Sequence, residues 1–306
     1  FNARTCGPWV GPRMAPPARR RRRSLPLLLR VLCASRLPSC ACAAGPAAGD
    51  EGQPPGRGAV PPDGGRGAEP WGEFGERRLR FFRERLGFEP RTVLDVGAHV
   101  GDWSRAARHL FPEADFLLVE ADPRHAQRLA ETGLPFEIAL LAARANETVT
   151  FHTTRYWITT GASIFRERTA FYSDPRLSRP VRLRTRALDE LALGRLGPEC
   201  CELLKADVQG AELEVLRGAP RVLRNAQLVL LEAAILPYNE GAPRFSELVA
   251  FMAAAGFEVV DIVDAMHCED VERVLHFDVL FAPIGSRFLQ FPFPGGIRGR
   301  RPGPGG

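Results

Sequence analysis

Lys205 and Asp207 have the residue types and the spacing to act on a substrate. They lie two positions apart in the run 202–207, which predicts a short strand, so both side chains should project from one face. A glycine turn at Gly210 and a helix follow, which places both groups at the carboxyl end of the strand, where open α/β sheets bind ligands. A carboxylate there can take a proton from a hydroxyl. Lys205 is also the only lysine among the 41 basic residues, which indicates a positioned role.

A second group, about a hundred residues earlier, has the pattern of a nucleotide site. Residues 92–96 predict an apolar strand, and Gly97 and Gly101 follow Asp95 in a turn that leads into a helix. Glycines let the backbone approach a ligand closely, and helix amides face the turn. The next predicted strand ends at Glu120, whose carboxylate can accept hydrogen bonds from a ribose diol. Dinucleotide-binding folds share this plan, but their fingerprint is G-x-G-x-x-G and the spacing here differs.

Both segments resemble signatures of the FkbM family of S-adenosylmethionine-dependent methyltransferases. Residues 205–218 are similar to its pattern K-x-D-x-x-G-x-E-x-x-V-L-x-G, and residues 95–101 to D-x-G-A-N-x-G, with His99 where the family usually has Asn. Residues 188–191, Leu-Asp-Glu-Leu, resemble a T-L-D-E-L run that precedes the fourth strand of the family. The resemblance extends over about residues 93–282 and implies an S-adenosylmethionine cofactor.

The candidate cofactor-binding residues lie in the glycine turn or directly after the second strand: Asp95, Gly97, His99, Gly101, Glu120 and Asp122. We expect Asp95 to hold the ammonium of the cofactor, directly or through water, and Glu120 to bind the ribose. Asp122 should order the same loop, where the family usually reads E-P-x-P.

The candidate catalytic residues are Asp207, Lys205 and Glu232. Asp207 should face the transferred methyl group as a base or an orienting group; alternatively it is a structural carboxylate paired with Lys205. Glu232 closes the fifth predicted strand and could contact the substrate, whereas Glu212 opens a helix and is better interpreted as its cap. The cysteines and histidines lack metal-ligand spacing, so the sequence predicts no metal site.

Composition divides the chain into a core and two tails. Residues 1–69 contain 11 Arg and 4 acidic residues among many Pro, Gly and Ala, a composition that predicts disorder. Residues 284–306 form a basic Gly/Pro tail, and residues 70–283 hold 26 basic and 32 acidic residues, enough chain for one α/β domain. Because the positive charge belongs to the tails, we expect no nucleic-acid partner.

The N-terminal segment resembles a targeting peptide. A run of five arginines at 19–23 precedes the short apolar stretch 25–33 and an Ala-Cys-Ala sequence, as in a secretory signal, while Arg30 and the lack of acidic residues before Asp50 fit an organellar transit peptide. Low-complexity sequence without a targeting role is the alternative. The apolar stretch is too short to span a bilayer, so we expect no transmembrane segment.

The elements predict an α/β fold with a mostly parallel, Rossmann-like class I methyltransferase sheet. A lead-in helix over 71–86 precedes strands at 92–96, 115–120, 135–140, 202–207 and 228–232, and strands at 257–263 and 276–282 close the sheet as an antiparallel hairpin. Extra strands are expected at 147–152 and 181–185. The irregular segment 153–184 is interpreted either as a substrate loop or as an exposed insertion.

These features predict a methyltransferase, most simply an O-methyltransferase. The family resemblance implies a hydroxyl acceptor on a carbohydrate or a natural-product-like small molecule. Two alternatives stay open: a non-catalytic cofactor-binding module, and a nicotinamide-dependent oxidoreductase, which the missing third glycine disfavours.

Overall fold

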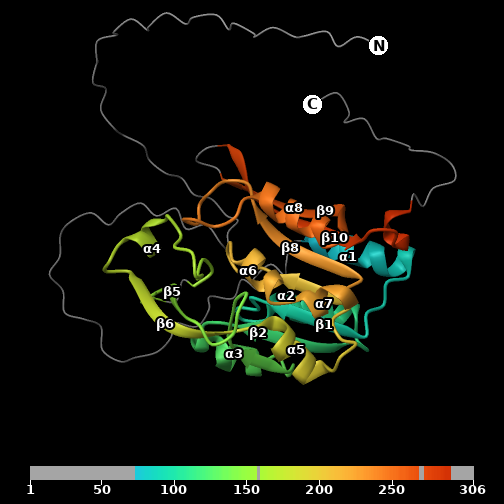
Figure 1. Cartoon of the computed structure of the whole chain (residues 1–306), viewed down its shortest axis with the longest axis horizontal. Coiled ribbons are helices and arrows are strands. Elements are labelled where there is room, and N and C mark those ends of the chain that lie inside the picture. Colours follow the sequence, from blue (N-terminus) through green and yellow to red (C-terminus); the bar gives the residue numbers. More distant parts are fainter. Residues whose placement is uncertain (1–72, 157–158, 269–271, 291–306) are drawn as a thin grey trace, which may run out of the picture. The chain divides into compact units, whose positions relative to one another are not determined.

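The computed structural model describes residues 73–156, 159–268 and 272–290. Its centre is a seven-stranded sheet in the order β3-β2-β1-β7-β8-β10-β9 (Figure 1). These strands are β1 (Thr92–Val96), β2 (Asp115–Glu120), β3 (Phe136–Ile138), β7 (Leu203–Ala206), β8 (Leu228–Ala234), β9 (Phe257–Cys268) and β10 (Arg273–Pro283). The first five are parallel, and β10 is antiparallel to both β8 and β9, which confirms the predicted fold class.

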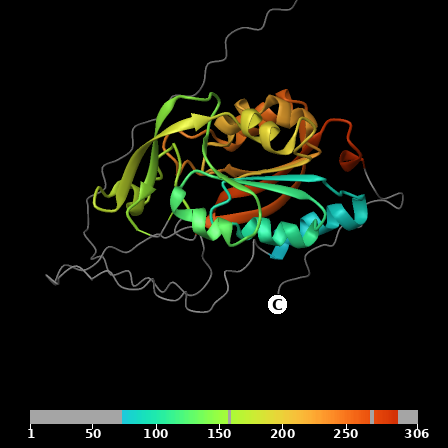
Figure 2. The same cartoon turned by 90° about the horizontal axis from the view of Figure 1, so that it is seen from below.

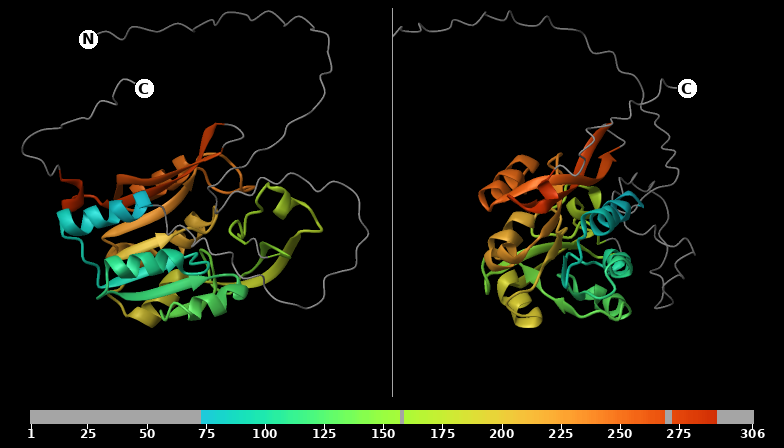
Figure 3. Two further views of the ribbon diagram at one scale, coloured as in Figure 1. Left: turned by 180° about the vertical axis from the view of Figure 1, so that it is seen from behind. Right: turned by 90° about the vertical axis from the view of Figure 1, so that its right-hand side faces the viewer.

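Helices cover both faces of this sheet (Figures 2 and 3). On one face lie α1 (Glu73–Leu86), α2 (Asp102–Leu110), and α3 (Ala126–Ala130), which follows the short helix η1 (Pro123–His125). On the other lie α5 (Leu188–Leu196), α6 (Glu212–Arg217), α7 (Pro220–Asn225) and α8 (Phe245–Ala254). The alternation along each strand explains the two layers: Leu203 packs toward α1 and α2, while Leu204 packs toward the other helices.

The predicted helix after the fourth strand is two helices, α6 and α7. Pro220 lacks an amide hydrogen and occupies the first turn of α7, where that hydrogen is not needed. Gly218 follows α6 and must lack a side chain, because a Cβ there would lie 2.4 Å from the carbonyl oxygen of Ala142. Asp189, from the Leu-Asp-Glu-Leu run, accepts hydrogen bonds from Arg221 N and Val222 N at the start of α7. This motif residue therefore joins α5 to α7.

A three-stranded sheet beside the main one accounts for the extra strands. β4 (Leu140–Leu141) pairs with β6 (Ser178–Arg186), which pairs with β5 (Thr148–Thr154) in the order β4-β6-β5. The predicted third strand therefore splits, because residues 136–138 pair with β2 while residues 140–141 pair with β6. The described part of the segment 153–184 contains the last two residues of β5, the short helix α4 (Ala170–Ser173) and most of β6.

The start of the predicted C-terminal tail packs on the domain. Residues 287–289 form the short helix η3 (Arg287–Leu289), where Phe288 contacts the rings of Phe82 and Phe88, and Arg287 donates to the carbonyl of Gly87. The predictions for residues 1–69, including the targeting peptide, and for residues 291–306 lie outside the described residues. Within the described part of the chain, no helix has both the length and the apolar character needed to cross a bilayer.

Candidate active site

The carboxyl ends of β1, β2, β7 and β8 bring the predicted site residues to one edge of the sheet. Lys205 links Asp95 to Asp207, because its Nζ lies 3.1 Å from Asp95 Oδ1 and 3.7 Å from Asp207 Oδ2. The first contact follows from the register of the parallel strands, in which Asp95 and Lys205 are direct partners. Lys205 Nζ also donates to the carbonyl of Gly97 at 3.1 Å. The single lysine is therefore held by three oxygens at this edge.

Lys205 is almost fully buried, and its electrostatics follow from its neighbours. Burial alone would lower the pKa of Lys205, but the carboxylates of Asp95 and Asp207 more than offset that effect and hold it above its ordinary value. The ammonium therefore stays charged at neutral pH and stabilises Asp207 as a carboxylate. Burial also opposes the charge on Asp207, but Lys205 and the amide of Gln209 hold its pKa below the ordinary value.

Asp95 is more deeply buried than Lys205 and Asp207. It is fully buried, its Oδ2 accepts a hydrogen bond from Ser104 Oγ at 2.6 Å, and its Oδ1 faces Lys205. In this conformation Asp95 holds the strand ends and α2 together and presents no exposed oxygen. The predicted contact with the ammonium of the cofactor stays a prediction, and this geometry favours a route through water or through a neighbouring group.

The glycine turn owes its sequence to close backbone packing. Gly97 has φ +76°, and a Cβ at this position would lie 1.8 Å from the carbonyl oxygen of Asp207. Gly101 has φ +84°, and a Cβ there would lie 2.7 Å from Thr132. Left-handed backbone disfavours a side chain at both positions, and at Gly97 the close backbone oxygen is a second, independent reason for glycine. The turn that begins at Gly97 thus presses directly against the end of β7.

Glu120 is the best-formed ligand candidate in the cofactor half of the site. Its Oε2 accepts a hydrogen bond from His99 N and its Oε1 accepts one from Asp122 N, both at 2.8 Å. A carboxylate has about four acceptor positions, so Glu120 retains acceptor capacity for a ribose hydroxyl. Burial raises the pKa of Glu120 to about 7, and the backbone amides of Asp122, His99 and Ala121 only partly counteract it. The residue fits the diol contact expected for S-adenosylmethionine.

Asp122 orders the loop after β2. It accepts hydrogen bonds from the backbone and the guanidinium of Arg124, and from Thr153 Oγ1 at 3.0 Å. Arg124 in turn donates to the carbonyls of Thr154 and Tyr156, each at 2.9 Å. Asp122 and Arg124 therefore join the cofactor loop to the end of β5.

His99 occupies the motif position of the family asparagine, and its ring contacts the segment after β5. Its Nε2 lies 3.0 Å from Thr159 Oγ1, and the same hydroxyl lies 2.9 Å from Nε2 of His125. The two imidazole centroids are 4.2 Å apart. Burial lowers the pKa of both rings, that of His125 to about 4, so both are neutral at neutral pH. A neutral pair can share the hydroxyl, which donates to one ring and accepts from the other.

The half of the candidate site that is expected to face the acceptor contains a polar network around Glu232. Gln209 Nε2 donates to Asp207 Oδ1 at 2.9 Å and to Glu232 Oε2 at 3.2 Å, so its amide joins the two predicted carboxylates. Tyr238 donates its hydroxyl to Glu232 Oε1 at 2.6 Å, and His276 Nδ1 lies 3.5 Å from the same oxygen. Burial and the nearby charge of Asp207 raise the pKa of Glu232 well above its ordinary value.

Glu212 has the structural role expected of it. Its Oε1 accepts hydrogen bonds from the amides of Val208 and Gly210, which fixes the turn after β7.

Sequence reasoning missed Gln209, Tyr238, His276, Thr159 and His125. Gln209 lies inside the motif and takes φ +54°, a left-handed conformation that aims its amide at both carboxylates. His276 is far from Glu232 in sequence and reaches it only because β10 pairs with β8. No local signal in the sequence could have identified that contact.

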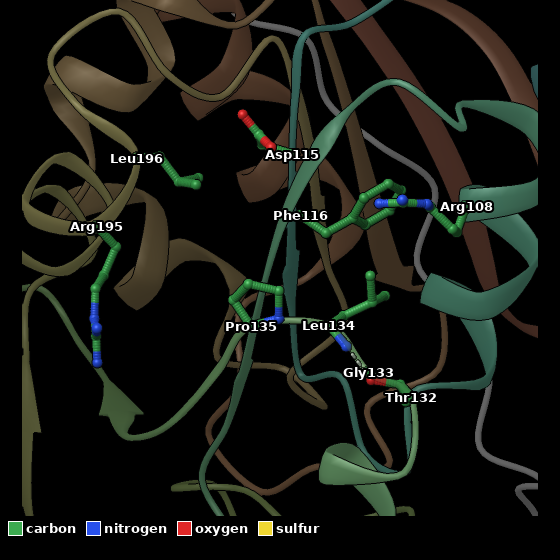
Figure 4. Close-up of a pocket in the computed structure, with 9 residues that line it drawn as sticks. All are labelled: Arg108, Asp115, Phe116, Thr132, Gly133, Leu134, Pro135, Arg195 and Leu196. Atoms are coloured by element: carbon green, nitrogen blue, oxygen red, sulfur yellow. Dashed lines mark hydrogen bonds between the residues drawn. The ribbon is translucent and has the colours of Figure 1, made fainter.

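A surface depression lies in another part of the molecule. It has a volume of about 500 Å³ and lies beside the start of β2 at Asp115, whereas Glu120 ends that strand. Figure 4 shows Arg195 and Leu196 on one side of it and Arg108 beside Phe116 on the other. It is therefore separate from the candidate active site.

The family model of the methyltransferase FkbM domain matches residues 95–259, more than half of the chain and both halves of the site. The chain belongs to the FkbM methyltransferase family. This assignment confirms the predicted methyltransferase class and supports S-adenosylmethionine as the cofactor.

Three proteins illustrate the similarity. The 2-O-methyltransferase NoeI of Sinorhizobium fredii is 29% identical over 164 residues, which cover 49% of this chain and 66% of NoeI, just under two thirds of its length. The FkbM methyltransferase structure from Methylobacillus flagellatus is 14% identical, covers 66% of this chain and 47% of that one, and has a TM-score of 0.39. The O-methyltransferase TomG of Streptomyces achromogenes, solved with S-adenosylmethionine, is 16% identical, covers 69% and 79%, and has a TM-score of 0.38.

Proposed function

We propose that this FkbM methyltransferase transfers the methyl group of S-adenosylmethionine to a hydroxyl of a carbohydrate or a natural-product-like small molecule. The observation that carries the proposal is the Gln209 amide, which joins Asp207 and Glu232 at the sheet edge beside the glycine turn. The amide places an ionised carboxylate next to the turn expected to hold the cofactor. Similarity to a 2-O-methyltransferase supports a hydroxyl as the acceptor.

The protein must align the acceptor hydroxyl with the methyl group and provide a proton acceptor; the methyl group itself needs little activation. The sulfonium of the bound cofactor supplies a good leaving group, and the acceptor oxygen attacks the methyl carbon as the carbon–sulfur bond breaks. The hydroxyl proton must leave the oxygen, because a neutral alcohol is a weak nucleophile.

Asp207 is the group best suited to take that proton. Its pKa is held low by Lys205, and its side chain is 38% exposed, so it is ionised and reachable from the acceptor side. Burial and the charge of Asp207 raise the pKa of Glu232, which favours its protonated form and makes it less suited to accept the proton. Lys205 lies behind Asp207 and acts by keeping it charged and oriented.

The test measures turnover, cofactor affinity and melting temperature on the same preparations. With labelled S-adenosylmethionine and a panel of sugars and polyols, the wild-type chain should yield a methylated product. Asp207→Asn should bind the cofactor normally and lose about 10²–10⁴-fold in turnover, the loss expected for a general base. Full activity in this variant would refute the role of Asp207.

Lys205→Arg provides the matched test of the partner. The planar guanidinium cannot replace a compact ammonium held by three oxygens without moving them, so turnover should fall. A structural pair would instead lower stability and cofactor affinity together in both variants. Cofactor binding without any product from the wild-type chain would favour a non-catalytic module.

A further inference from the structure

The polar network around Glu232 continues across β10 into a group of three potential metal ligands. Glu232, His276 and Asp278 each offer one ligand atom, and these atoms all lie within 4.8 Å of one another. The strand register explains the convergence: Glu232 is the direct partner of Asp278, and His276 lies two positions away on the same face of β10. Two adjacent strands of the central sheet therefore hold all three donors.

The spacing suits one bound cation. Ligand atoms that bind a small divalent cation at about 2.1 Å lie at most about 4.2 Å apart, when they are opposite each other. The three atoms therefore need only a small closing movement, which side-chain rotation can supply. Glu232 is buried and the other two are half-buried, so this is not an exposed acidic cluster.

The charges at this edge favour a cation as well. Besides Glu232 and Asp278, the edge carries Asp207 on one side and Asp264, the partner of Asp278, on the other. Lys205 is committed to Asp95 and Asp207. The groups that donate hydrogen bonds to Glu232, the Gln209 amide and the Tyr238 hydroxyl, are neutral, and a buried carboxylate is more stable beside a full positive charge.

We propose that Glu232, His276 and Asp278 form a binding site for a divalent transition-metal cation. One imidazole and two carboxylates form a mixed nitrogen and oxygen set, which suits Mn²⁺ or a similar first-row ion better than Mg²⁺. Ligands bind in their deprotonated form, so binding of the ion competes with protonation of the three side chains. If the proposed function is correct, the ion lies beside Asp207 and can orient the acceptor hydroxyl.

Manganese titration of the purified full chain, followed by electron paramagnetic resonance and calorimetry, tests this site. Mn²⁺ is the suitable probe because the seven cysteines of the chain could capture Zn²⁺ elsewhere. We expect one Mn²⁺ per chain, and a loss of affinity of at least about tenfold in His276→Gln and in Asp278→Asn, in the range of lost metal-site interactions. His267→Gln is the matched control, because His267 is an exposed residue of the same hairpin.

Absence of saturable binding, or equal affinity in His276→Gln and in the wild type, would overturn the site. S-adenosylmethionine affinity is measured on each variant to show that it is folded. The outcome is separable from the proposed function: methyl transfer without Mn²⁺ binding overturns only the metal site, whereas Mn²⁺ binding without methyl transfer supports the site and counts against the reaction.

Discussion

Replacing Gly97 by alanine tests the contact between the glycine turn and the end of β7. Two costs are expected. The left-handed backbone at φ +76° costs a non-glycine residue about 1–2 kcal/mol. In addition, the new Cβ would lie 1.8 Å from the carbonyl oxygen of Asp207, a backbone atom that can move only with its strand. Overpacking of this kind adds about 1–3 kcal/mol, for a total loss of about 2–5 kcal/mol.

Gly133→Ala separates the two costs. Gly133 has φ +70°, close to that of Gly97, but a Cβ there would meet nothing within 4 Å. The control should therefore lose only the conformational part, about 1–2 kcal/mol. The difference between the two variants measures the clash with β7.

Urea denaturation of both variants gives the two free energies of unfolding, and turnover is measured on the same samples. Gly97→Ala should also lose activity, because the displaced carbonyl belongs to Asp207 itself, whereas Gly133→Ala should retain it. Equal losses of stability in the two variants, with activity retained in both, would show that the turn does not press on β7 as described.

Three further predictions concern the cofactor, the pH dependence and the N-terminal segment. Glu120→Ala should weaken S-adenosylmethionine binding by about 1.5–3 kcal/mol, because charged hydrogen bonds to the ribose are lost; unchanged affinity by calorimetry in a folded variant would exclude the contact. Burial raises the pKa of Glu212 from 4.5 to about 7, so the folded state binds a proton at this carboxyl more tightly than the unfolded state does. The stability that this proton contributes is therefore complete below about pH 4.5 and is lost as the pH rises through 7. Glu212→Gln keeps an acceptor oxygen for the Val208 and Gly210 amides, so its melting temperature should fall less than that of the wild type between pH 5 and 7; parallel curves would contradict this. Removal of residues 1–69 should leave the melting temperature within a few degrees and cofactor affinity unchanged, and a large loss in either would show that the segment docks on the domain.

The sequence predicts best what depends on short spacing. Lys205 and Asp207 are two apart on a strand, and in the structure they do lie together at its carboxyl end. The apolar runs likewise predict the sheet and its final hairpin, because strand periodicity and turn residues are local properties.

Contacts that depend on strand order or register could not be predicted. Asp95 faces Lys205 because β1 and β7 are neighbours, a fact that the sequence between them does not encode locally. The same holds for Glu232 with His276 and Asp278, which only the antiparallel pairing of β8 and β10 brings together. A search for motif spacing finds ligands that lie close together in the sequence. It therefore misses groups whose members are distant in sequence and meet only in the folded sheet.

The hydroxyl of Thr159 has a consequence for engineering of acceptor specificity. It lies between His99 of the cofactor turn and His125 of the helix after β2, so the segment after β5 shares a hydrogen bond with the part of the domain that is expected to hold the methyl donor. If that segment is grafted from a homologue that has asparagine in place of His99, its donors and acceptors would not match those of His99 and His125 in this chain. A successful exchange would have to transfer the threonine and both histidines as one unit, and a screen for new acceptors should record donor affinity alongside product formation.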